Sequence, residues 1–390
     1  MFAVFFSGRT QTSPFAACRT LRAATLFFCA LALMLVAPSA AHARKHTPSH
    51  DHAPAHNHKH KGVKRPAASP NGPAYGNLAR VRELAHTLAQ SHQLPVAWVQ
   101  QQLQQARRLS GIGQMVLPPT QPTAKNWRAY RERFIEPRRI EAGVNFWRTY
   151  RDALERAQQT YGVPAEMVVG IIGVETFFGQ HTGNYRVIDT LTTLTLDFPK
   201  SHPRAEQRQA FFQNELGVYL KLQHDQRFAQ RDVKGSFAGA LGWPQFMPSS
   251  LSQFAVDFDG DGRVDLQNSP VDAIGSVAHY FQSFGWVTGM PTHYPVSFDA
   301  ARLDLPNLLA PDILPSFSLA NFEAKGAVLD EQGRQHKGLL ALIELFNGDD
   351  APSYVAGTEN FYVVTRYNWS SYYAMAVIEL GQAVKAAMGN

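Results

Sequence analysis

The stretch that decides the fold is Tyr161-Gly-Val-Pro-Ala-Glu-Met-Val-Val-Gly-Ile-Ile-Gly-Val-Glu-Thr-Phe-Phe-Gly179. Pro164 is typical of a first helical turn, and Gly179 is typical of the position just past a helix end. Between them apolar residues cover nearly every face, so we expect a buried helix. Gly170 and Gly173 should let neighbouring backbones approach it closely.

Glu175 is the exception in this apolar segment, because it places a carboxylate near the end of a buried helix. Burial and the negative end of the helix dipole both disfavour the charged form and raise the pKa. A carboxyl group that stays protonated near neutral pH is suited to general acid catalysis. The residue pattern fits equally well a buried glutamate paired with a lysine or an arginine.

Hydrophobic periodicity predicts further helices on both sides of this one. The first begins near Asn77 and the second near Pro95, and the others cover 142–161, 204–222, 270–284 and 372–387. The apolar face of the first helix repeats every three or four residues through Leu78, Val81, Leu84, Ala85 and Leu88.

The residue pattern changes from helical spacing to short apolar runs between residues 320 and 365, and these runs flank a hairpin-like turn at 330–333. Residues 339–346 and 361–365 are predicted to be strands. The fold class is therefore α+β and mainly helical, with a small β-sheet lobe inserted late at about 320–365.

The N-terminus predicts export. Arg9, Arg19 and Arg22 precede an apolar run at 23–38, and a small-residue site ends at Ala43. This order is typical of a signal peptide cleaved after residue 43. The alternative, a membrane anchor, fits less well because the run is short for a span. We therefore expect a periplasmic protein.

Both cysteines lie within this leader. Lipid attachment at Cys29 is not expected, because bulky phenylalanines precede it and apolar residues continue after it. A mature chain without cysteine has no disulfide, no thiolate metal site and no cysteine nucleophile.

Residues 44–75 are rich in His, Pro and Lys, and we expect a disordered linker there. Residues 1–43 and 44–66 carry net charges of +3 and +5, whereas the whole chain carries +6. The remaining residues are thus slightly acidic, which argues against nucleic-acid binding by the folded part, residues 76–390.

The segment Asp257-Phe-Asp-Gly-Asp-Gly-Arg-Val-Asp265 matches the first half of a Ca²⁺ loop. The expected ligands are the side chains of Asp257, Asp259 and Asp261 and the backbone carbonyl of Arg263. Asn268 stands at the twelfth position, so Asp272 would have to supply the late carboxylate. A calcium sensor is not expected, because only one such loop is present.

Two aromatic segments have the composition of sugar-binding sites. They are Gly235-Ser-Phe-Ala-Gly-Ala-Leu-Gly-Trp-Pro-Gln-Phe-Met-Pro-Ser-Ser250 and Arg366-Tyr-Asn-Trp-Ser-Ser-Tyr-Tyr-Ala-Met-Ala376. Considered alone, the first segment is better explained as a packed loop, and the second could line a cleft or fill the core.

Together these segments resemble the B-type lytic murein transglycosylases, which have a lysozyme-like catalytic core. The similarity runs from about residue 134 to the C-terminus, with looser agreement from Asn77. It rests on Phe134-Ile-Glu-Pro137, Gly173-Val-Glu-Thr176, Gly235-Ser-Phe-Ala-Gly-Ala240, Gln245-Phe-Met-Pro-Ser-Ser250, Pro270-Val-Asp-Ala-Ile-Gly-Ser276 and Arg366-Tyr-Asn368.

The resemblance implies that Glu175 is the sole catalytic acid/base. It also implies a glycan groove lined by Ser236, Gln245, Tyr367, Asn368 and Tyr373. The calcium ion would be structural, with no organic cofactor. Two departures are present: Trp243-Pro244 replaces an aromatic–glycine pair, and the calcium loop is one residue longer before Asp272.

The implied reaction cleaves the β-1,4 bond between N-acetylmuramic acid and N-acetylglucosamine without water and leaves a 1,6-anhydro end. Peptidoglycan strands are the expected partner, cell-wall synthesis or remodelling proteins are further candidates, and a monomer is expected. One alternative is a hydrolytic muramidase, which would need a second carboxylate about 5–9.5 Å away. The candidates for it are Asp189, Asp197, Glu206 and Glu215. The other alternative is a non-catalytic wall-binding protein.

Overall fold

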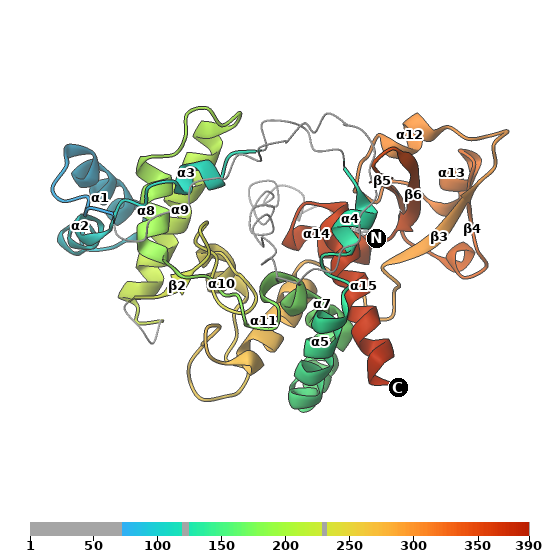
Figure 1. The fold of residues 1–390 in the computed structure, drawn as a ribbon, viewed down its shortest axis with the longest axis horizontal. Helices are drawn as coiled ribbons and strands as arrows, with labels where there is room; N and C mark the ends of the chain where they lie inside the picture. Colours follow the sequence, from blue (N-terminus) through green and yellow to red (C-terminus); the bar gives the residue numbers. More distant parts are fainter. Residues whose placement is uncertain (1–71, 119–124, 228–231, 390) are drawn as a thin grey trace, which may run out of the picture.

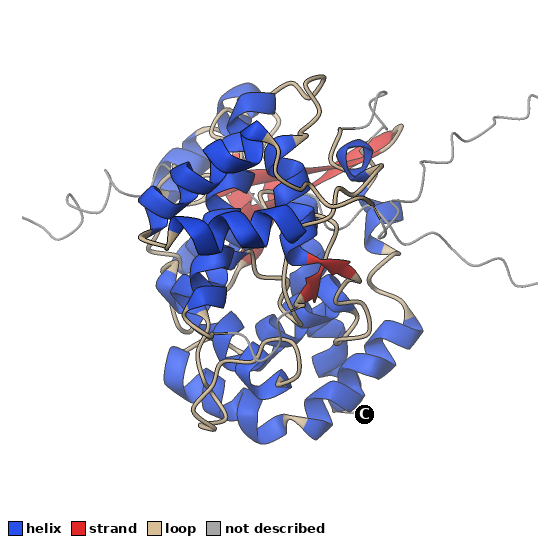
Figure 2. Ribbon diagram, turned by 90° about the vertical axis from the view of Figure 1, so that its left-hand side faces the viewer, coloured by secondary structure: helices blue, strands red, loops and turns tan. Residues whose placement is uncertain are grey.

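A computed structural model describes residues 72–118, 125–227 and 232–389. Within these ranges helices dominate, and the strands form a two-stranded ribbon and one four-stranded sheet (Figures 1 and 2). The expected mainly helical α+β fold is therefore confirmed. None of the helices in these ranges has the length and apolarity needed to cross a bilayer.

The part of the chain at the left of Figure 1 is built from helices far apart in sequence. It contains α1 (Ala79–His92), α2 (Val96–Gln105), α3 (Ile112–Met115), α8 (Val187–Leu196), α9 (Ala205–His224) and α10 (Pro248–Phe254). The predicted apolar face of α1 is buried from Val81 onward, but Leu78 precedes the helix and is exposed. Tyr75 is buried and donates to Asp197, so the end of the expected linker belongs to the folded part. The leader and linker residues 44–71 lie outside the described residues.

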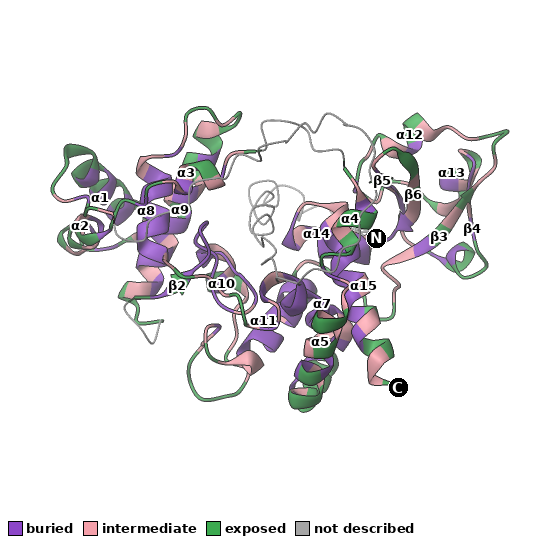
Figure 3. Ribbon diagram, viewed as in Figure 1, coloured by how far each residue is buried: buried purple, intermediate pink, exposed green. Residues whose placement is uncertain are grey.

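The helix predicted first, α7 (Ala165–Thr176), lies in the middle of the molecule and is buried on nearly every face (Figure 3). It is surrounded by α5 (Pro137–Thr149), α6 (Arg151–Tyr161), α11 (Pro270–Ser283) and α15 (Ser371–Met388). A Cβ atom at Gly170 would lie 2.2 Å from the Val377 carbonyl oxygen of α15. The expected close approach is thus confirmed, and α15 is the neighbour that uses it.

The single helix predicted over 142–161 is wrong, because the structure has two helices there. Glu136 caps α5 by accepting from the backbone of residues 138 and 139, and Pro137 occupies the first turn, so α5 begins earlier than predicted. The chain then bends at Tyr150, whose φ and ψ of −112° and 28° lie outside the helical region. The apolar spacing alone did not reveal this break.

The β lobe, at the right of Figure 1, is an antiparallel sheet of order β4-β3-β6-β5. Its elements are β3 (His293–Phe298), α12 (Leu305–Leu309), α13 (Leu319–Ala324), β4 (Ala327–Leu329), β5 (Ala341–Asn347) and β6 (Asp350–Gly357). The lobe has a hydrophobic cluster of its own around Tyr294, Leu308 and Phe322. The predicted strand 339–346 is confirmed as β5. The turn at 330–333 does not form a hairpin, because β4 pairs with β3 and β5 pairs with β6.

The strand predicted at 361–365 is wrong, because these residues lie in α14 (Glu359–Tyr367). Thr358 caps this helix by accepting from the backbone of Asn360. Phe361, Val363 and Val364 face the core from it. A short apolar run cannot distinguish a buried helix from a strand, and the cap is the local signal that was overlooked.

Candidate active site

Glu175 lies in the last turn of α7 and is partly buried. Its Oε1 accepts a hydrogen bond of 2.5 Å from the Tyr373 hydroxyl in the first turn of α15. Burial raises the pKa of Glu175 to about 7, although the hydrogen bond from Tyr373 acts in the opposite direction. The carboxyl group can therefore both give and accept a proton near neutral pH.

The end of α7 is built differently from the expected glycine termination. Phe177, at the C-cap, and Phe178 after it both have positive φ values, of 51° and 55°. The Thr176 hydroxyl accepts from Gly179 N and donates to the Trp243 carbonyl oxygen over 3.0 Å. This ties the end of the helix to the loop 235–250.

That loop follows the ribbon of β1 (Tyr185–Arg186) and β2 (Lys234–Gly235). Ser236 is buried, and its hydroxyl oxygen accepts from the backbone of residues 238 and 240. Gln245 is also buried and has a φ of 50°, and its amide nitrogen donates to the carbonyl oxygens of residues 182 and 242. Both side chains therefore hold the loop in shape.

Two predicted groove residues lie beside Glu175. The rings of Tyr367 and Tyr373 stack with centroids 6.4 Å apart, and the Tyr367 hydroxyl donates to the Pro244 carbonyl oxygen. One connected chain of contacts thus runs from Glu175 through Tyr373 and Tyr367 to the segment before Gln245. Asn368 is buried directly after Tyr367 and lines a neighbouring hollow.

This hollow has a volume of 750 Å³ and lies between the core and the β lobe. Its walls include Asn368 and Tyr372, Glu344 of β5, and Tyr130 of α4 (Trp127–Arg131). Burial raises the pKa of Tyr130, and the Glu175 carboxylate raises it further. Sequence reasoning missed Tyr130, whose only local signal was its spacing of three from Trp127.

Trp243, the aromatic member of the Trp243-Pro244 pair that departs from the family pattern, makes structural contacts. Its ring covers Gly179, where an added Cβ would lie 2.5 Å away, and its indole N–H donates to the Gln267 carbonyl oxygen. It therefore joins the end of α7 to the acidic loop that follows α10.

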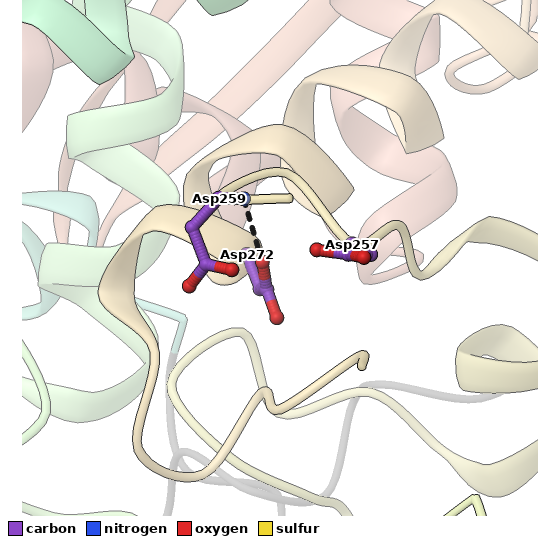
Figure 4. A group of neighbouring side chains, drawn as sticks. All are labelled: Asp257, Asp259 and Asp272. Carbon is purple, nitrogen blue, oxygen red and sulfur yellow. Dashed lines mark hydrogen bonds between the residues drawn. The ribbon is translucent and has the colours of Figure 1, made fainter. Parts of the chain in front are cut away.

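In the acidic loop, the side chains of Asp257, Asp259 and Asp272 face a common space (Figure 4). One oxygen of each lies within 4.8 Å of the others. Asp272, in the first turn of α11, accepts from the backbone of residues 258, 259 and 265. Its pKa is raised, mainly by burial and also by Asp259.

Three hard oxygen ligands at this spacing fit Ca²⁺, whose oxygen ligands lie at about 2.3–2.6 Å from the ion. The three-carboxylate group does not include Asp261 or Arg263, which were also predicted. Asp261 is exposed, and its Oδ1 accepts from Arg263 N. The structure thus brings together three of the four predicted side-chain ligands, and the Arg263 carbonyl oxygen stays a prediction.

Three of the four carboxylates that could have served a hydrolase have hydrogen-bond partners elsewhere, and the fourth is exposed. Asp189 accepts from Arg186 and from the backbone of Arg107, and Asp197 accepts from Tyr75 and Arg80. Glu215 accepts from Ser249, and Glu206 is exposed at the start of α9. None of these contacts involves Glu175.

Residues 77–382 match the family model of the transglycosylase SLT domain. The chain belongs to this transglycosylase family. It is 39% identical over 326 residues to membrane-bound lytic murein transglycosylase B of Escherichia coli, covering 81% of this chain and 85% of the relative. The transglycosylase is therefore a peptidoglycan lytic enzyme, and the expected family is confirmed.

Solved relatives agree with the lysozyme-like fold. The Escherichia coli lytic transglycosylase SLT35, solved in complex with bulgecin A, matches this transglycosylase with a TM-score of 0.71 and 38% identity, covering 82% of this chain and 96% of SLT35. SLT35 has also been solved in complex with calcium, with a TM-score of 0.70. The soluble lytic transglycosylase SltB1 of Pseudomonas aeruginosa matches with a TM-score of 0.70 and 38% identity, over 80% of this chain and all of SltB1.

Proposed function

We propose that Glu175 is the only acid/base of this lytic transglycosylase and that it acts twice. The single observation that carries this proposal is the Glu175 carboxyl itself, with a pKa of about 7 and the Tyr373 hydroxyl at 2.5 Å. A group poised near neutrality can donate in one step and accept in the next.

In the first step, protonated Glu175 gives its proton to the glycosidic oxygen between N-acetylmuramic acid and N-acetylglucosamine. The C1–O bond breaks and C1 develops oxocarbenium character, which the 2-acetamido group of the same sugar can stabilise. Tyr373 holds the carboxyl group in place and stabilises the carboxylate that the transfer creates.

In the second step, the Glu175 carboxylate removes the proton from the C6 hydroxyl of the muramic acid. The C6 oxygen attacks C1 and closes a 1,6-anhydro ring, so no water is consumed and Glu175 is protonated again. Ser236, Gln245, Tyr367 and Asn368 form the groove around the strand. Tyr130 and the 750 Å³ hollow extend that groove toward the β lobe.

The test is mass spectrometry of the fragments released from purified peptidoglycan. Muropeptides lighter than their reducing counterparts by one water are expected from the wild-type chain and absent for Glu175→Gln. Reducing muramic-acid ends would contradict the two-step role of Glu175.

A structural Ca²⁺ ion bound by Asp257, Asp259 and Asp272 is a second part of the proposal. The ion would offset two of the three negative charges of the clustered carboxylates and fix the loop that Trp243 joins to α7. Calcium should raise the unfolding temperature in proportion to the logarithm of its concentration, whereas magnesium at equal ionic strength should not. Asp259→Ala, which removes the ligand oxygen, should abolish the calcium effect, and an unchanged effect would refute this ligand set.

The place of action is the third part. The leader predicts export to the periplasm, where the substrate lies, with a cleaved signal peptide. The mature chain is proposed separately to be a monomer. N-terminal sequencing of the exported protein tests the cleavage after Ala43, and light scattering tests the monomer.

A further inference from the structure

Arg139 lies in the first turn of α5 and reaches the end of the catalytic helix. Its Nη1 donates to the Gly173 carbonyl oxygen over 3.1 Å. The guanidinium carbon lies 4.7 Å from the ring centroid of Phe177 and 5.0 Å from that of Phe134. Arg139 therefore contacts α7 two residues before Glu175 and two residues after it.

The two phenylalanines that follow Glu175 are held in different ways. Phe178 is 7% exposed and packs against Phe146, with ring centroids 5.4 Å apart, so the core holds it. Phe177 is more exposed and contacts Arg139 and His181. A positive φ is costly for a phenylalanine, so this backbone persists only where its surroundings hold it. Arg139 supplies such a contact for Phe177.

The position is an unfavourable one for a guanidinium group. Arg139 Nε is buried and has no hydrogen-bond partner within the described part of the chain. Burial lowers the pKa of Arg139, although the nearby Glu136 opposes this. An apolar side chain of similar length would fill the same space without this desolvation cost. Packing alone therefore does not account for an arginine at this position, and its specific contribution is the hydrogen bond to the Gly173 carbonyl oxygen of α7.

We propose that Arg139 is a positioning residue that holds the last turn of α7 so that the Glu175 carboxyl faces Tyr373 and the substrate. Arg139 itself does not touch the sugar. Thr176 holds the same turn through a separate hydrogen bond to the Trp243 carbonyl oxygen, and Arg139 adds a second restraint. This proposal rests on the assignment of Glu175 as the acid/base.

The decisive variant is Arg139→Met, compared with Arg138→Met as a matched control. Arg138 is the exposed neighbour in the same helical turn, so its replacement should leave activity unchanged. On a soluble oligomer of alternating N-acetylglucosamine and N-acetylmuramic acid, Arg139→Met should lower kcat by about 10- to 100-fold, because small misplacements of a catalytic group have effects of that size. KM should change little, since the groove residues are untouched.

Two further readouts separate positioning from simple loss of structure. The unfolding temperature of Arg139→Met should not fall, because a desolvated charge has been removed. Arg139→Lys should recover part of the kcat, since an ammonium can still donate to Gly173 O but cannot stack on Phe177. The pH midpoint of activity should stay where it is in the wild type.

The outcomes distinguish the two proposals. Full kcat in a folded Arg139→Met protein, with Glu175→Gln inactive, would overturn only the role of Arg139. A loss of kcat that matches a loss of folded protein, with no recovery in Arg139→Lys, would also overturn it. Activity in Glu175→Gln would instead overturn the assignment of the acid/base.

Discussion

Two glutamates of this transglycosylase, Glu175 and Glu215, have pKa values that are raised alike, but their surroundings differ. Burial raises the pKa of Glu175 and of Glu215 to about 7. Glu215 is 1% exposed in α9, and its two oxygens accept from the backbone N–H and the hydroxyl of Ser249. Glu175 is partly exposed and accepts from one phenol.

The difference lies in what surrounds each carboxyl group. Ser249 is in the first turn of α10, so the Glu215 carboxyl group accepts hydrogen bonds at a helix N-terminus, where backbone donors need such a partner. Glu175 lies at the opposite pole of its own helix, where a negative charge is disfavoured. A shifted pKa alone therefore does not identify a catalytic residue, and the partners and exposure of each group favour Glu175 for the proposed role.

The largest expected contrast is in activity. Glu175→Gln should lower the release of anhydro-muropeptides by about 100-fold to 10,000-fold, because it removes the general acid and the general base together. Glu215→Gln should stay close to the wild type, since its side chain serves α10. Circular dichroism of both variants checks that they are folded. Equal losses of activity in the two folded variants would mean that the different surroundings of Glu175 and Glu215 do not separate their roles.

A second contrast concerns the hydroxyl groups that donate hydrogen bonds to the two glutamates. Tyr373→Phe removes the hydrogen bond that lowers the pKa of Glu175, so that pKa should rise. The upper limb of the pH–activity profile requires protonated Glu175 and should move to higher pH, with kcat lower by about 10-fold.

Ser249→Ala is the matched control for this contrast, because it removes the hydroxyl donor from Glu215. The pH–activity profile should keep its midpoint, and the free energy of unfolding should fall by about 1 kcal/mol. A shifted activity profile in Ser249→Ala would mean that Glu215 takes part in the reaction.

The sequence predicted one of these glutamates and left the other among several candidates. Glu175 stood out because it interrupts an apolar helix, and α9, α11 and α15 followed from their hydrophobic spacing. Glu215 lies in a helix of mixed composition, and its burial comes from α10, which is distant in sequence. Tyr130 and Arg139 were missed for the same reason, because their roles depend on contacts with α7 that no local pattern records.

The smallest expected effect is on the pH dependence of stability. Each glutamate has a pKa of about 7 when folded, above the 4.5 of an ordinary glutamate. Between these two pH values each glutamate keeps a proton in the folded state that it has lost in the unfolded state. Its contribution to the free energy of unfolding is therefore complete below about pH 4.5 and declines as the pH rises to about 7.

Glutamine at position 215 cannot titrate, so the free energy of unfolding of Glu215→Gln should decline less with rising pH than that of the wild type. The difference should be on the order of 1 kcal/mol. Glu175→Gln should flatten the decline in the same way, although only that variant loses activity. Urea unfolding at pH 5, 6, 7 and 8 measures the slopes. A Glu215→Gln curve parallel to the wild type would mean that Glu215 is charged when folded, and only Glu175 would then be held protonated by its surroundings.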